Sequence, residues 1–376
     1  MEYKLKDIIT FKPGYAFKKS DMTDTGIDLV KIGNLKNNKV IIPSGVKIKE
    51  DTKFQDFIIN KGDILMALTG DPVYKGNIQT WVGRTSIYLN NKVAYLNQRV
   101  CKLIPNEKII LGDYLYYWLI RRDKTYEIAG LFHGSANQAN ISHKEVGEMF
   151  IELPSLEIQK KASNILSDID KKIELNNEIN NNLYEEAVAL YKDKFKEIGQ
   201  SKKTIGDYIV PKRGKNLLTR DAIDGDTPVV AGGIAPSAYH NQFNTKSPVI
   251  TISASGANAG YTNLWNIPVW ASDCSYIDDS ITKNVYFWYI ILKTRQNEIF
   301  DAQTGSAQPH IYPQHIAEMS IGELNIAEVE KYNNSVAPLF KMIGENQKEN
   351  KKLSQLRDTL LPKLMNGEID LDNIEI

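Results

Sequence analysis

The residue types that most often carry out catalysis form no recognisable catalytic motif in this sequence. Asp71-Pro72-Val73-Tyr74 is one residue away from the Asn/Asp-Pro-Pro-Tyr/Phe loop with which DNA amino-methyltransferases hold a flipped base, but it lacks the second proline and an upstream glycine-rich cofactor loop. We interpret it as a turn. A Walker A loop does not occur. The histidines show no metal-ligand spacing; they are His133, His143, His240, His310 and His315.

Clusters of cations instead favour contact with a polyanion. Residues 202–220 hold Lys or Arg at six positions against one acid, Asp207. Such clusters attract nucleic-acid phosphates and position a protein without reading sequence. The candidates of this kind are Lys12, Lys18, Lys19, Lys31 and Lys36 in the first half and Lys212, Arg213, Lys215 and Arg220 in the second.

Reading of bases requires forked or amide groups aimed at base edges, Arg for guanine and Asn or Gln for adenine. Side chains that could do this, or that lie in polar loops beside them, are Arg84, Gln98, Arg99, His133, Ser135, Asn137 and Gln138, then Ser253, Ser255, Asn258, Ser306, Gln308 and His310. For each residue taken alone, an ordinary solvated surface position is the alternative. We expect about half of the set to lie on a DNA-binding face.

The chain contains one unit twice. Leu5 to Gly14 matches Ile205 to Gly214, with apolar residues, Asp, Lys and Gly in register. Later matches have an offset of about 170 residues; they are Tyr116-Tyr117-Trp118 with Tyr286-Phe287-Trp288, Gly134-Ser135-Ala136 with Gly305-Ser306-Ala307, and Met149 with Met319. The fall in offset places roughly 30 extra residues between the Gly and the Trp of the first copy.

The front part of each copy is predicted to be a mixed α/β globule, giving an α+β fold. Short apolar runs at 64–68 and 249–252 are typical of buried strands, and 111–122 and 284–295 of short helices. We place these globular domains at 1–153 and 199–324.

The back parts, 154–198 and 325–366, are predicted to be long helices, and 367–376 an acidic tail. Apolar residues recur at alternating spacings of three and four, the heptad pattern of a coiled coil. Both stripes carry two asparagines at matched positions, which fix register because a slipped pairing would leave an amide unpaired. An antiparallel pair with a pseudo-two-fold axis sets Asn176 opposite Asn350 and Asn180 opposite Asn346. The alternative is that each stripe packs on its own globule.

Further local marks carry a resemblance to a known family. They are Lys61-Gly62-Asp63-Ile64-Leu65 running into Thr69-Gly70, the segment Leu153-Pro154-Ser155-Leu156-Glu157-Ile158-Gln159-Lys160, and the end of the second helix, Leu356-Arg357 through Leu360-Leu361-Pro362-Lys363-Leu364-Met365-Asn366-Gly367. In these marks and in the order of its parts, essentially the whole chain resembles the specificity subunit of type I restriction–modification enzymes.

The resemblance implies two target-recognition domains that each read one half of a split double-stranded DNA sequence, with the helices as a ruler between them. It also implies two DNA-methyltransferase subunits as partners and, for restriction, two ATP-dependent translocase–nuclease subunits. S-adenosylmethionine, ATP and magnesium would belong to those partners, so this chain would hold no cofactor and would not be an enzyme.

Length, charge and cysteine content agree with this interpretation. A chain of 376 residues suits two domains, and 42% hydrophobic with 24% charged residues is typical of a globular protein. Two distant cysteines and the absence of a long apolar run favour a cytoplasmic protein without a membrane segment. The equal counts of 46 basic and 46 acidic residues require DNA contacts to come from local segregation of charge. Two rivals stay open: a DNA-modifying enzyme with an unrecognised site, and a coiled-coil adaptor between proteins.

Overall fold

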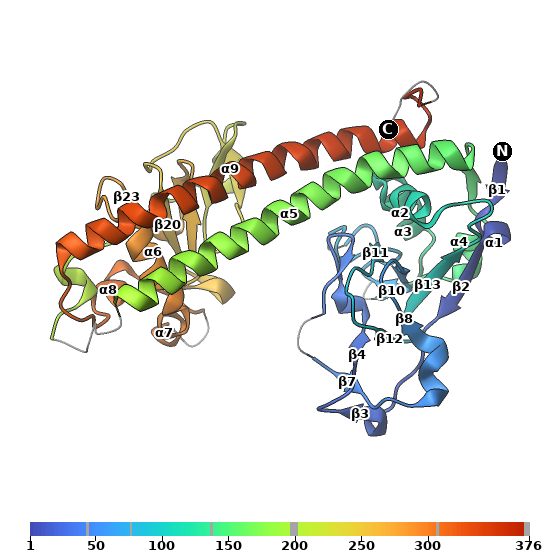
Figure 1. Ribbon diagram of the computed structural model, residues 1–376, viewed down its shortest axis with the longest axis horizontal. Helices are drawn as coiled ribbons and strands as arrows, with labels where there is room; N and C mark the ends of the chain where they lie inside the picture. Colours follow the sequence, from blue (N-terminus) through green and yellow to red (C-terminus); the bar gives the residue numbers. More distant parts are fainter. Residues whose placement is uncertain (43–44, 76, 136–137, 196–201, 306–307, 372–376) are drawn as a thin grey trace. The chain divides into compact units, whose positions relative to one another are not determined.

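The computed structural model describes residues 1–42, 45–75, 77–135, 138–195, 202–305 and 308–371 (Figure 1). The chain divides into two compact units, one formed by Met1–Lys171 with Leu353–Ile376 and the other by Lys172–Lys352. Each unit combines a mixed α/β globular domain with segments of two long helices. This is the fold class that the sequence predicts.

The long helices are α5 (Leu156–Lys194) and α9 (Ile326–Met365), of 39 and 40 residues. At 1.5 Å per residue each is roughly 60 Å long. Both begin at polar caps: the Ser155 hydroxyl accepts from the Ile158 N–H at 3.3 Å, and the Asn325 side chain accepts from the Ala327 N–H at 3.1 Å. Helix α9 continues through Pro338 and Gly344, which weaken but do not end it.

The main sheet has the same four-stranded antiparallel core in both units. In unit 1 the order is β2 (Ile9–Pro13), β13 (Val100–Pro105), β9 (Ile64–Ala67), β11 (Thr85–Ile87). In unit 2 it is β17 (Lys212–Arg213), β23 (Cys274–Asp278), β20 (Val249–Ser253), β21 (Thr262–Trp265). The buried runs at 64–67 and 249–253 are central strands, because neighbours on both sides cover them. The internal repeat read from the sequence is therefore repeated in topology.

A second sheet holds the equivalent parallel pair in each unit, β4 (Ile27–Val30) with β12 (Ala94–Leu96) and β18 (Thr227–Val230) with β22 (Trp270–Ala271). In both units an antiparallel strand flanks this pair: β7 (Lys47–Ile48) next to β4, and β19 (Ala238–His240) next to β18. Over the described residues, unit 1 alone has β3 (Met22–Thr23) and β8 (Ile58–Ile59) at the margins of this sheet, and β5 (Leu35–Lys36) and β6 (Lys39–Val40) at one margin of the main sheet. These strands lie between Gly14 and Trp118, where the offset predicts the extra residues of the first copy.

Short helices complete each domain. Helices α2 (Gly112–Ile120) and α3 (Arg122–Gly130) of unit 1 correspond to α6 (Val285–Thr294) and α7 (Gln296–Asp301) of unit 2. Trp118 and Trp288 are buried in the respective cores. Each domain also has smaller elements, among them α1 (Leu5–Ile8), α4 (His143–Gly147), α8 (Pro313–Ala317) and the strand pair β1 (Glu2–Lys4) with β16 (Phe150–Glu152).

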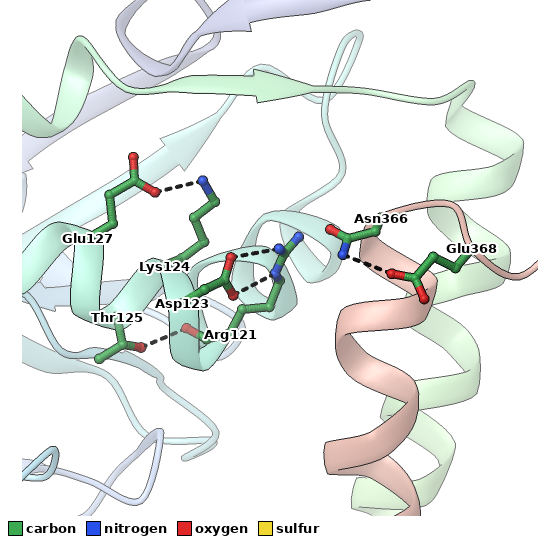
Figure 2. A network of polar contacts seen from close by, with 7 residues as sticks. All are labelled: Arg121, Asp123, Lys124, Thr125, Glu127, Asn366 and Glu368. Carbon is green, nitrogen blue, oxygen red and sulfur yellow. Dashed lines mark hydrogen bonds and ion pairs between the residues drawn. The ribbon is translucent and has the colours of Figure 1, made fainter.

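The junction of α2 and α3 is fixed by an ion pair near the end of α9 (Figure 2). The Arg121 guanidinium donates to both Asp123 oxygens at 3.0 and 2.7 Å, and Thr125 donates to the Arg121 carbonyl at 3.0 Å. Burial raises the pKa of the Asp123 carboxyl, but the hydrogen bonds and the charge of Arg121 lower it, and the result is a pKa below the usual value. On the other side Asn366 donates to Glu368 at 3.2 Å. These contacts hold the junction of α2 and α3 and the turn that follows α9 in their local conformations.

Segments of α5 and α9 run antiparallel within each unit. In unit 2 the Asn176 amide donates to Asn350 at 2.8 Å and to Glu349 at 2.7 Å, and the Asn346 amide donates to Asn180 at 2.8 Å. These are the two pairings that the heptad alignment predicts. Asn176 is 1% exposed, so its amide has no access to water as an alternative partner.

The stripes also pack on the globular domains, so the two arrangements weighed from the sequence occur together. Tyr332, Val336 and Phe340 of α9 belong to the core of the second domain, and Tyr332 donates to the Ala187 carbonyl of α5 at 2.8 Å. In unit 1, Arg357 of α9 pairs with Asp170 of α5 at 2.8 Å.

The segment after α9 joins unit 1. Gly367 has a φ of +70°, which lets the helix end in a left-handed turn. Ile369 and Leu371 then pack against the first core, where Leu371 is 2% exposed, and Lys161 donates to its carbonyl at 3.1 Å. As far as residue 371, the predicted acidic tail is thus a packed part of the first unit.

The asparagine layer gives a first prediction. Asn350→Leu alone removes one of the two acceptors of the buried Asn176 amide, and we expect the free energy of unfolding to fall by about 1–3 kcal/mol. Adding Asn176→Leu replaces both partners by apolar groups and should restore most of that loss. Chemical denaturation followed by circular dichroism measures both changes, with Asn182→Leu on the exposed side of α5 as the control. A double variant as unstable as the single one would contradict this account.

Candidate nucleic-acid interface

Three loops meet at one end of the main sheet in unit 1, and we call them the loop frame: residues 14–15 after β2, 97–99 between β12 and β13, and 68–70 after β9. Backbone hydrogen bonds hold them together; they run from Gly14 N to Val100 O (3.0 Å), Tyr15 N to Leu96 O (2.9 Å), Gln98 N to Tyr15 O (2.9 Å) and Leu68 N to Arg99 O (2.9 Å). Because the backbone makes these bonds, the side chains at the loop tips can vary without loss of the frame.

Unit 2 builds the same loop frame from residues 214–215, 271–273 and 254–258. The equivalent bonds run from Gly214 N to Cys274 O (2.8 Å), Lys215 N to Ala271 O (2.9 Å) and Ala254 N to Asp273 O (3.1 Å). A Cβ on Gly14 would lie 2.3 Å from the Leu96 carbonyl oxygen, and one on Gly214 would lie 2.3 Å from that of Ser272. The glycine repeated in the sequence is therefore required by close backbone approach.

The described residues that flank or begin the repeated Gly-Ser-Ala segments lie beside each frame. In unit 1, β10 (Thr69–Gly70) pairs with β15 (Gln138–Asn140), which pairs with β14 (His133–Ser135). Thr69 donates to Asn140 at 2.9 Å. In unit 2, His310 forms bridges with Ser255 and Thr304, and the Gly256 N–H donates to Pro309 at 3.1 Å. Each unit thus joins a sheet-end frame to a polar loop.

The first frame brings together several of the residues that the sequence selects. Gln98 and Arg99 are exposed at the tip of their turn. His133 is also exposed and contacts Glu145, and this hydrogen bond lowers the pKa of the Glu145 carboxyl. Lys12 lies on β2 and pairs with Asp56 at 3.1 Å.

The second frame carries a different set of polar groups. Arg213 and Ser255 both contact the carboxylate of Asp273, which therefore holds one cation and one hydroxyl in place. Asn258 ends the short turn at 256–258. His310 stacks on Tyr312 with ring centroids 6.0 Å apart. The two frames share their backbone, but their side chains differ.

Two predicted base-reading residues do not face outward. Arg84 turns into the domain and donates to the carbonyls of Ile32, Leu35, Thr80 and Trp81 at 2.6 to 3.2 Å. Its guanidinium is used to hold loops in place. Ser253 is 3% exposed in the central strand β20, and its hydroxyl has no hydrogen-bond partner among the residues that the structure describes. Position in the sequence does not determine the direction of either side chain.

Most other candidates lie on the surface outside the loop frames, except Lys215, which belongs to the second frame. Lys18, Lys19 and Lys36 are exposed on the segments between β2 and β6, with Lys31 partly exposed; in unit 2, Lys212, Lys215, Arg220 and Gln308 are exposed. Lys212 and Lys215 flank Gly214 of the second frame. Ser135 and Gln138 pair through their backbones. Asn137 and Ser306 lie outside the described residues.

Thr69 and Asp273 belong to the frames but are not among the residues that the sequence selects. Thr69 directly follows the buried strand 64–67, a position that favours a polar side chain at a sheet end. Asp273 is negatively charged and repels phosphate, so the pattern of cations in the sequence does not indicate it. Its role is to orient Arg213 and Ser255.

Over the described residues, no cluster of three or more His, Cys, Asp or Glu side chains could hold a metal ion. Cys101 and Cys274 are buried, and burial raises the pKa of each thiol to about 12, so neither is a reactive nucleophile. No helix in the described ranges is long and apolar enough to span a membrane.

Comparison with known proteins finds similarity to one family. Residues 1–185 match the model of the type I restriction modification DNA specificity domain. The chain is 26% identical over 319 residues to the MjaIX type I restriction enzyme specificity subunit of Methanocaldococcus jannaschii, covering 74% of this chain and 73% of the relative. It is 23% identical over 312 residues to a putative type I specificity subunit of Mycoplasma genitalium, covering 77% and 81%.

A solved structure shares the fold. The crystal structure of the S subunit of a type I restriction–modification system from M. genitalium superposes with a TM-score of 0.60, over 97% of this chain and 95% of that one, at 20% sequence identity.

The close approach at Gly14 gives a second prediction. Gly14→Ala forces the 14–15 and 97–99 loops apart, and we expect a loss of about 1–3 kcal/mol of local stability. Hydrogen exchange followed by mass spectrometry should show faster exchange at 12–15 and 96–100, with unit 2 unchanged. Gly33→Ala is the matched control, because a Cβ there meets no atom within 4 Å. Equal exchange in the two variants would remove the steric role assigned to Gly14.

Proposed function

We propose that this chain is a specificity subunit of a type I restriction–modification enzyme and that it reads a DNA target in two parts, one with each globular domain. The observation that carries this proposal is that one backbone frame occurs twice with different side chains at its tips. A shared frame with unlike tips suits two readers of the same kind that recognise unlike base sequences.

In the first domain, Gln98 and Arg99 suit direct base reading. Both are exposed on one turn, where an Arg fork matches guanine and a Gln amide matches adenine. In the second domain, the Arg213–Asp273–Ser255 group offers a guanidinium held in a fixed orientation, and Asn258 offers an amide. The exposed lysines around both frames supply phosphate contacts, which position the domains without selecting a sequence.

The repeat also supports a partner arrangement. Because each unit joins a similar domain to antiparallel segments of α5 and α9, two copies of one partner can bind equivalent surfaces. Two DNA-methyltransferase subunits fit that requirement, with two ATP-dependent translocase–nuclease subunits added for restriction. S-adenosylmethionine, ATP and magnesium then belong to those partners. This chain supplies recognition and scaffolding.

Selection from a random duplex library by the full chain tests the proposal, because the library contains every short target sequence. We expect two unlike short motifs separated by a gap of constant length. Enrichment should weaken steeply as salt rises, because phosphate contacts release counterions. A single continuous motif would overturn the two-part reading, and no enrichment at any salt concentration would overturn DNA recognition by this chain.

Arg99 gives a third prediction. Arg99→Ala should lower affinity for the selected duplex by about 10- to 100-fold, the loss of one good base contact at 1–3 kcal/mol. Selection with the variant should relax one of the two motifs and leave the other intact. Lys108→Ala, an exposed cation on the same domain outside the frame, is the control and should change neither motif. Loss of both motifs in Arg99→Ala would contradict a local reading role.

The helix pair gives a fourth prediction. Insertion of seven residues into α5, with seven at the facing position of α9, lengthens both helices by about 10.5 Å. At about 3.4 Å per base pair, the gap in the selected sequences should grow by roughly three base pairs with both motifs unchanged. Altered motifs at the original gap would contradict a spacing role for the helices.

A further inference from the structure

A buried amide on α5 makes three hydrogen bonds, two of them to the first domain and one to the segment that leads into α5. Gln159 is 0% exposed; its side-chain oxygen accepts from the Leu111 N–H at 2.9 Å, and its amide nitrogen donates to the carbonyls of Ile109 and Pro154 at 3.0 and 3.1 Å. Leu111 immediately precedes α2, whose first N–H groups have no partner within that helix. One side chain of the long helix thus caps the start of the short helix.

A buried amide on α9 does the same for the second domain. Asn333 is 5% exposed; its oxygen accepts from the Tyr286 and Phe287 N–H groups at 3.1 and 3.3 Å, and its nitrogen donates to the Lys283 carbonyl at 3.2 Å. Tyr286 and Phe287 lie in the first turn of α6. Again, a long helix satisfies the free N–H groups of the short helix that follows the main sheet.

The two amides do not occupy equivalent positions in the repeat. The matched asparagines align the two long helices at an offset of 170 residues. In this alignment Val329 is the repeat equivalent of Gln159, and Ser163 is the repeat equivalent of Asn333. The two amides therefore lie at different positions of the repeat, but each makes the same type of contact with the start of a short helix. A requirement of the architecture explains this better than simple retention from the duplicated ancestor.

A directional contact is what this junction needs. Apolar packing alone lets a helix turn or slide on a domain at small cost, since burial is non-directional. A buried amide with three partners and no water has one orientation that satisfies it, and any other leaves polar groups unpaired. The short helices α2 and α6 pack in turn on β11 and β21 of the main sheets, beside the strands that end in the loop frames.

We infer that Gln159 and Asn333 are positioning residues that fix how each recognition domain is oriented on its helix segments, and so restrict the gap between the two halves of the target to one length. The inference rests on the proposed two-part reading. Neither residue contacts DNA in this account; each acts through a short helix and the sheet it supports.

Selection from the random duplex library tests this with the full chain carrying Gln159→Ala or Asn333→Ala. We expect both motifs to persist while the preference for one gap over its neighbours falls about tenfold, which corresponds to 1.4 kcal/mol. Ser163→Ala is the matched control: Ser163 is 3% exposed on α5, but its hydroxyl donates only within that helix, to Lys160 at 3.2 Å. It should keep the single gap.

The conservative variant Asn333→Asp separates positioning from general stability. Its carboxylate still accepts from the start of α6, where a negative charge is favourable, but it cannot donate to the Lys283 carbonyl, so the preference for one gap should fall less than in Asn333→Ala. Loss of affinity with an unchanged gap in both alanine variants would reduce the two amides to ordinary core residues. A wild-type chain that selects no constant gap would instead defeat the two-part reading itself.

A distance measurement covers variants that fold but do not bind. Lys108→Cys and Lys171→Cys place labels on the first domain and on α5, and the native cysteines are buried and unreactive. Spin-label distances should be narrowly distributed in the parent chain and broad with Gln159→Ala. A distribution as narrow as in the parent would overturn the inference for Gln159.

Discussion

The structure depends on the need of two long amphipathic helices to bury their apolar stripes. A helix of about 40 residues cannot do this alone, and each stripe here is too long for the domain that precedes it. The stripes are therefore shared: part packs on a domain, and part packs on the other helix. The antiparallel direction follows because each helix must begin at the end of its own domain and still meet its duplicate.

The buried polar groups give this non-directional packing its geometry. Asn176 and Asn350 set the register of the helix segments in unit 2, since any slip would leave a 1% exposed amide among apolar neighbours. Gln159 and Asn333 set the contact between helix and domain in the same way. Apolar area supplies most of the stabilisation, and a few amides decide which of several similar packings is adopted.

The features predicted well from sequence are those that periodicity and repetition determine. The asparagine pairing follows from heptad spacing, and Gly14 and Gly214 follow from their recurrence in register, because both patterns reflect backbone geometry. The direction of a side chain in an irregular loop has no such signature. Arg84 is predicted to read bases, but its guanidinium donates to two nearby carbonyls, of Thr80 and Trp81, and to two that lie 49 and 52 residues away in the chain. Asp273 escapes prediction because its role comes from partners 60 and 18 residues away.

The strands found only in the first copy have a consequence for how such proteins diversify. Strands β5 and β6 extend one margin of the main sheet, while β3 and β8 extend the second sheet beyond the three strands that it has in both units. New hydrogen-bonding positions at a margin accept added chain without disturbing the strands behind them. New surface can therefore be gained by adding strands at the sheet margins, while the loop frames that depend on Gly14 and Gly214 keep their backbone structure.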